Sequence, residues 1–119
     1  MRLSKEPMNP SLKKQIEREF AQVLADLKDV NEAETFMRDF FSQNDIETYA
    51  KRLAIAYWMK KNKGFIPTKL NLKVSSATVA WIKKAYTKPG FELAIKKMEA
   101  DEWANQWADR IKNVIGKKE

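Results

Sequence analysis

The side chains best suited to a chemical task lie in one short run. Ser75-Ser76-Ala77-Thr78 offers small and hydroxyl groups, and Ala80 and the pair Lys83-Lys84 follow it. Hydroxyl groups can hydrogen-bond to several base edges, and the methyl groups of alanine and threonine can contact the methyl group of thymine. Lysine ammonium groups beside such a run can reach phosphates. These residue types predict nucleic-acid binding.

The lysines of this run belong to a long stretch of one charge sign. Residues 43–90 hold ten basic and two acidic side chains, and no Asp or Glu lies between Glu47 and Glu92. The whole chain has a formal net charge of +7, so this stretch accounts for all of the excess. Such a field attracts polyanions. The alternative is a solvated lysine face, but solvated faces usually mix both signs.

The composition argues against an enzyme and against a metal site. The 119 residues include no cysteine and no histidine, which removes disulfides, thiolates and the commonest general base. No apolar run approaches the roughly 20 residues that span a bilayer, and the first residues lack an apolar signal core. We therefore expect a cytoplasmic protein that is not an enzyme, uses no cofactor or metal and does not enter a membrane.

A helix-turn-helix over about residues 66–86 would present the candidate side chains. Ile66, Leu70 and Leu72 are expected to face inward from its first helix, and Val74 is expected to fill the angle at the turn. Lysines flank the motif and are expected to reach phosphates, as in the known docking of such motifs: Lys69, Lys73, Lys83, Lys84 and Lys88.

The second helix of this motif would enter the major groove. Ser75 is a good N-cap for it, and Tyr86 marks its expected end. Val79, Ile82 and Tyr86 would face inward. The outward face then carries the groove-contacting candidates: Ser76, Ala77, Ala80, Lys83 and Lys84, with Thr78 near its edge.

The remaining sequence also has mostly helical periodicity. Asn9-Pro10 predicts the start of the first helix. Asn31 with Glu34, and Asn44 with Glu47, have the spacing of capping boxes for the next two helices, and Gly64 is expected to cap the third. The third helix is expected to bury one stripe: Ile46, Tyr49, Ala50, Leu53, Ala56 and Tyr57.

The C-terminal part predicts a helix after the breaker at residues 87–90. Its apolar stripe changes face near Glu99–Glu102, which predicts a bend or a new helix there and an extra helix over about 101–116. Trp103, Trp107, Ile111 and Val114 share one face of that helix, which we expect to reinforce a dimer. Together these elements predict one all-α domain over residues 1–119, with about six or seven helices.

An ordered set of segments resembles the Trp repressor family. These segments are Phe40–Asn44, Ala50–Ala56, Leu72–Val79, Lys83–Tyr86 and Gly90–Ala94. The resemblance implies a Trp-repressor-like helical bundle that forms an intertwined homodimer and presents two motifs to successive major grooves of double-stranded DNA. The aromatic load of the first two helices also favours a dimer, although those rings would alternatively fill the core of a monomer.

The resemblance also implies a corepressor position, from which this chain departs. In the family, an arginine on the third helix and an arginine on the recognition helix hold tryptophan, and a glycine follows the second arginine. Arg52 lies at the first of these positions, but Trp81 replaces the second arginine and Ile82 replaces the glycine. We expect Trp81 to block this slot, so regulation by tryptophan is not expected.

Two functions fit these features. The first is a sequence-specific transcriptional regulator that reads the major groove. The alternative is a non-specific nucleic-acid-binding or interaction protein on the same scaffold, because the outward face lacks the Arg, Asn and Gln side chains that make bidentate base contacts.

Overall fold

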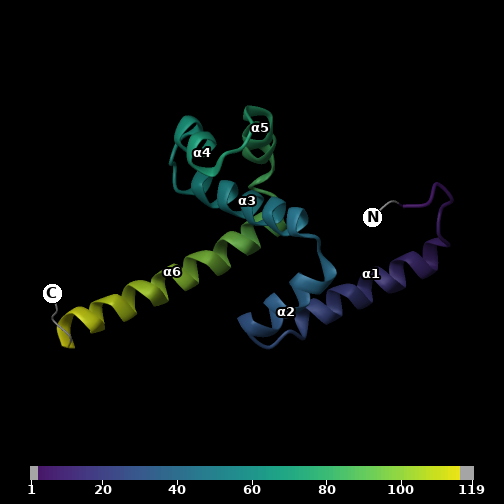
Figure 1. Ribbon diagram of the computed structural model, residues 1–119, viewed down its shortest axis with the longest axis horizontal. Helices are drawn as coiled ribbons and strands as arrows, with labels where there is room; N and C mark the ends of the chain where they lie inside the picture. Colours follow the sequence, from purple (N-terminus) through teal and green to yellow (C-terminus); the bar gives the residue numbers. More distant parts are fainter. Residues whose placement is uncertain (1–2, 116–119) are drawn as a thin grey trace. The chain divides into compact units, whose positions relative to one another are not determined.

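The computed structural model describes residues 3–115, with side-chain surroundings described for residues 3–102. Within that range all regular elements are α-helices (Figure 1). They are α1 (Pro10–Ala25), α2 (Val30–Phe40), α3 (Gln43–Lys60), α4 (Phe65–Leu72), α5 (Ser76–Ala85) and α6 (Pro89–Ile115). The predicted all-α class, with six helices in the described range, is confirmed.

The chain divides into two compact units, Met1–Ile46 and Glu47–Glu119. The first unit contains α1, α2 and the start of α3, and the second contains the rest of α3 with α4, α5 and α6. The single domain over residues 1–119 and the intertwined dimer stay predictions.

Local capping explains where the first three helices begin. The Asn9 side chain accepts hydrogen bonds from the amides of Ser11 and Leu12, as expected for α1. The predicted start of the second helix at Asn31 was wrong, because Asp29 caps α2 by accepting from the Glu32 amide at 2.9 Å. A carboxylate two residues earlier satisfies an orphan amide there, so the helix starts earlier.

The predicted start of the third helix was displaced in the same way. The Ser42 hydroxyl accepts from the Asp45 amide at 3.0 Å, and the Asp45 carboxylate accepts from the Ser42 amide at 3.3 Å. This reciprocal pair is a capping box that uses Asp45 in place of the expected Glu47. Glu47 instead pairs with Lys51 at 2.9 Å, one turn further along α3.

A cluster of phenylalanine rings packs the first unit. The Phe36 and Phe40 ring centroids are 4.3 Å apart, and Phe20 of α1 lies 6.0 Å from Phe36 and 6.3 Å from Phe40. The rings join α1 to α2. Neither helix, however, contains a fully buried residue.

The second unit has a core of its own, made by α3, α5 and α6. Ile55 and Ala56 of α3 pack with Val79 and Ile82 of α5 and with Ile95 of α6. Parts of the stripe predicted for α3 were wrong: Tyr49 and Ala50 are exposed, and the unpredicted Ile55 is fully buried. The reason is that α3 has neighbours on more than one side, so one amphipathic stripe does not describe its buried face.

Of the inward face predicted for α4, Leu72 is confirmed, whereas Ile66 and Leu70 were wrong. Ile66 and Leu70 are exposed, whereas Phe65 and Leu72 pack against the core and Thr68 is fully buried. The Thr68 hydroxyl donates to the Gly64 carbonyl at 2.7 Å, so its burial leaves no unsatisfied polar group. A threonine therefore occupies the central inward position, which a search for apolar spacing misses.

The α3–α4 connection uses Asn62 where Gly64 was expected. Asn62 has a φ of 58°, the Lys63 amide donates to the Trp58 carbonyl at 3.0 Å, and the Asn62 amide donates to the Met59 carbonyl at 3.1 Å. These two bonds form a Schellman motif. Gly64 instead precedes α4 as its N-cap, with a φ of 93°.

The new helix predicted to begin near residues 99–102 was wrong, because α6 runs from Pro89 to Ile115, and the alternative of a bend there stays a prediction. Between Phe91 and Ile115 there is no proline or glycine to interrupt the helix, and a change of apolar face needs no break in the backbone. The predicted stripe of Trp103, Trp107, Ile111 and Val114 lies outside the residues whose side chains are described. None of the described helices has the length and apolar character that crossing a membrane requires.

Candidate nucleic-acid interface

The predicted helix-turn-helix over residues 66–86 corresponds to α4, a short turn and α5 (Figure 1). The turn depends on Lys73, whose φ of 56° is in the left-handed region. The Val74 amide donates to the Lys69 carbonyl at 3.2 Å, which closes the end of α4. Lys51 supports the turn from α3, because its ammonium donates to the Lys73 carbonyl at 3.4 Å.

The start of α5 is capped as predicted. The Ser75 hydroxyl accepts from the Thr78 amide at 3.1 Å, and the two hydroxyl oxygens lie 2.9 Å apart. Val79, Ile82 and Ala85 are buried beneath the helix, and Tyr86 packs against the same core. The inward face predicted for α5 is therefore confirmed, which fixes the direction of its opposite face.

That opposite face is exposed. It consists of small side chains followed by lysines: Ser76, Ala77, Ala80, Lys83 and Lys84, with Thr78 beside them. Lys73 is also exposed, and Lys69 on α4 is partly buried. The structure thus brings the sequence candidates together on one helix-turn-helix.

The candidate lysines carry uncompensated charge. In the described part of the chain, Lys69, Lys73, Lys83 and Lys84 form no ion pair. By contrast, Lys61 lies 3.6 Å from the Glu99 carboxylate and 3.4 Å from that of Glu102. Glu99 and Glu102 of α6 therefore balance Lys61 of the α3–α4 connection, and among the described residues the four motif lysines have no acidic partner.

Lys61, Tyr57, Glu99 and Glu102 form a group that we call the Lys61 cluster. The pKa values of Lys61, Tyr57 and Glu102 are shifted in it. A hydrogen bond with Tyr57 lowers the pKa of Glu102, and Lys61 lowers it further although partial burial opposes this. The same hydrogen bond, together with burial, raises the pKa of the Tyr57 hydroxyl. For Lys61, burial acts to lower the pKa, but Glu102 and Tyr57 outweigh it and the net shift is upward. The cluster links α3 and its C-terminal connection to α6.

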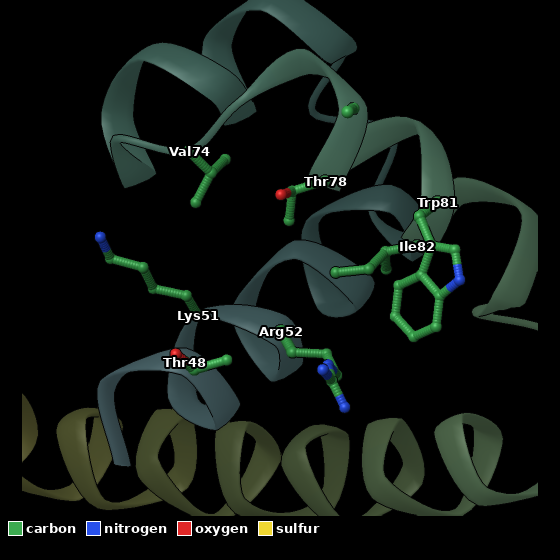
Figure 2. Close-up of a pocket in the computed structure, with 8 residues that line it drawn as sticks. Thr48, Lys51, Arg52, Val74, Thr78, Trp81 and Ile82 are labelled. Atoms are coloured by element: carbon green, nitrogen blue, oxygen red, sulfur yellow. The ribbon is translucent and has the colours of Figure 1, made fainter. Parts of the chain in front are cut away.

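A pocket of about 410 Å³ lies between α3 and α5 (Figure 2). Eight residues line it: Thr48, Lys51, Arg52, Val74, Ala77, Thr78, Trp81 and Ile82. Arg52 and Trp81, the two residues at the expected corepressor position, thus face the same space. Sequence reasoning missed Thr48 and Lys51, although Thr48 is one helical turn before Arg52 and shares its face of α3.

Trp81 is 53% exposed, and the guanidinium carbon of Arg52 lies 5.1 Å from the centroid of its indole. The same carbon lies 5.4 Å from the Tyr49 ring centroid. These distances are those of cation–π contacts. Trp81 and Ile82 form part of the pocket wall, and whether Trp81 prevents a ligand from binding stays a prediction.

The comparison with known protein families bears on this arrangement. The family model described as Trp repressor protein matches residues 15–99, which include α4, α5 and Arg52. The chain belongs to the Trp repressor family.

Members of the Trp repressor family are helix-turn-helix DNA-binding regulators, not enzymes. No curated protein and no solved structure matches the chain. In the part of the chain that the structure describes, no cluster of acidic side chains could hold a metal ion.

Proposed function

We propose that this member of the Trp repressor family is a sequence-specific transcriptional regulator that inserts α5 into the major groove of DNA. The observation that carries the proposal is the division of α5 into two faces. Val79, Ile82 and Ala85 are buried, and the opposite face offers small side chains followed by lysines. A helix with small outward side chains can approach base edges closely. Because its ligand is DNA, we propose that it acts in the cytoplasm.

The residues of the motif have different proposed roles. Ser76, Ala77 and Ala80 contact base edges, since they are exposed and near the start of α5. The Ser75 hydroxyl caps the helix, the Thr78 hydroxyl lies 2.9 Å from it, and both residues lie at the edge of the same surface. The flanking cations bind phosphates: Lys69, Lys73, Lys83 and Lys84.

We propose that the active form is a homodimer, because the first unit leaves apolar side chains in water. One stripe of α1 has exposed fractions of 40–49%, and it consists of Leu12, Ile16, Phe20, Val23 and Leu24. Phe40 of α2 is also exposed. Contiguous apolar surface of this kind commonly marks an interface. Two copies would present two α5 helices to major grooves about one helical turn apart.

Tryptophan is not the proposed effector. The indole of Trp81 lies against Arg52, the residue at the position where the resemblance implies corepressor binding. Titration calorimetry of the protein with free tryptophan should give no stoichiometric heat at micromolar concentration. Stoichiometric binding in that range would contradict this part of the proposal.

Variants that add a negative charge test the docking face. Ala77→Glu and Ala80→Glu place a carboxylate against base edges and phosphates without touching the core, so each should abolish DNA binding with an unchanged melting temperature. Ala100→Glu, at an exposed position on α6, makes the same charge change outside the motif and should bind almost normally. Normal binding by both motif variants would mean that another surface docks the DNA.

The second candidate is a protein that binds nucleic acid without sequence preference. The specific observation in its favour is that the exposed face of α5 carries no Arg, Asn or Gln. The affinity for a duplex selected from a random pool, compared with that for unselected duplex at the same salt concentration, separates the two. A specific regulator should prefer its selected site by at least about 10³-fold, whereas equal affinities would favour the non-specific protein.

A further inference from the structure

The pocket separates the start of α5, the proposed recognition helix, from α3. Val79, Ile82 and Ala85 anchor α5 on the core, but Ala77 and Thr78 face the pocket. The orientation of the helix start therefore depends on contacts that cross this space as well as on the core.

Two contacts connect α3 with the motif around the pocket. Lys51 donates to the carbonyl of Lys73 at the turn. Further along α3, the guanidinium of Arg52 lies beneath the indole of Trp81 (Figure 2), 5.1 Å from its centroid. The first contact holds the turn, and the second holds α5 itself.

Trp81 has no place in the core that would otherwise explain a tryptophan here. It lies next to the buried Ile82 but is itself 53% exposed. Arg52 also contacts the Tyr49 ring, so two aromatic rings restrain its guanidinium. A restrained planar cation is a better partner for an indole than a mobile one, because less side-chain freedom is lost when the contact forms.

We propose that Trp81, held by Arg52, is a positioning residue. It sets the orientation of α5 while no small-molecule effector is bound. This proposal rests on the proposed function, because its consequence is DNA binding that needs no ligand. The indole of Trp81, through its contact with Arg52, connects α5 with α3 at one side of the pocket.

DNA affinity, measured on ligand-free protein at fixed salt, tests the proposal. Trp81→Ala should weaken binding roughly tenfold, the effect of losing a partly exposed cation–π contact in each subunit. Trp81→Phe keeps an aromatic face and should restore most of the affinity. Because Trp81 is outside the core, both variants should melt within a few degrees of the wild type.

Arg52→Gln distinguishes positioning from direct contact with DNA. It removes the cation but leaves Trp81 in place, so it should weaken binding as much as Trp81→Ala does, and the double variant should be no weaker than either single variant. Full affinity of Arg52→Gln, or losses that add in the double variant, would overturn the proposal, because Trp81 would then act independently of Arg52.

Amide hydrogen exchange provides a second test that needs no DNA. Both single variants should speed exchange over the first turns of α5 and leave the amides around Ile95 of α6 unchanged. Unchanged exchange in α5 would overturn the proposal even if the protein binds DNA. Conversely, faster exchange in a protein that binds no duplex would contradict the proposed function and leave the positioning role of the contact supported.

Discussion

The two units of this chain differ in how completely they bury their apolar side chains. The second unit buries Ile55, Val79 and Ile82 completely and so forms its own core. The first unit stacks phenylalanine rings, yet α1 and α2 bury no residue fully. Buried apolar area is the main favourable term in folding. The helix-turn-helix therefore has a core of its own beneath it, whereas the first unit needs a further apolar surface, which we propose a second copy supplies.

The largest expected effect is on the core of the second unit. Ile55→Ala removes a fully buried side chain of α3 and should lower the free energy of unfolding by about 2–5 kcal/mol. Ile16→Ala in α1 makes the same chemical change where the side chain is partly exposed in a single subunit, so it should cost clearly less at a protein concentration low enough to dissociate the proposed dimer. Urea unfolding of both variants at one protein concentration is the measurement. Equal losses would remove the proposed difference between the units.

The next effect is on association. Phe40→Ala removes an exposed ring of the first unit and should raise the dimer dissociation constant by about 30-fold, as expected for a central aromatic contact. Ile66→Ala removes an exposed apolar side chain from α4 and should leave association unchanged. Sedimentation over a concentration series measures both. A monomeric wild type, or unchanged association of Phe40→Ala, would mean that the first unit is covered in another way.

Lys73→Gly should change stability and DNA binding in opposite directions. Glycine adopts the φ of 56° at this turn without the steric cost that lysine has there, so unfolding should become harder by about 1 kcal/mol. The same substitution removes one proposed phosphate contact per subunit, so the log–log salt slope of a dimer should become shallower by about 2. Thermal melting and DNA titration would show the two effects separately. A change of the same sign in both would contradict the assigned role of Lys73.

The smallest effect concerns the Lys61 cluster. The pKa of Glu102 is lowered in the folded protein, so its stabilising contribution is present above the ordinary pKa of glutamate and is lost as the pH falls through the folded pKa. Glu102→Gln should therefore melt below the wild type at neutral pH, and the two melting temperatures should converge as the pH falls below the ordinary pKa of glutamate and through the lowered folded pKa. A constant difference across this range would show that Glu102 acts through packing alone.

The parts of the fold that sequence reasoning predicted well are those that local rules govern. Asn9 and Ser75 cap their helices, and Val79 and Ile82 face inward, because capping and helical periodicity involve only near neighbours. The candidate residues of α5 could be found for the same reason, since the inward face of a helix determines its outward face.

Other features depended on competition between possible capping residues or on partners that are distant in the sequence. Asp29 and Ser42 capped α2 and α3 ahead of the predicted residues, because an earlier side chain satisfied the same amides. The burial of Thr68 needed the Gly64 carbonyl as acceptor, and the pairing of Arg52 with Trp81 joins residues on separate helices. An aromatic side chain next to an inward stripe, as at Trp81, is the one signal that would have indicated such a partner.

We propose above all that the motif lysines and the small outward face of α5 bind duplex DNA. Titration of the wild-type protein with duplex at several salt concentrations tests this binding. If each subunit neutralises about four phosphates, the log–log slope of affinity against salt should be close to −7. A slope near zero, or no binding at low salt, would contradict the account.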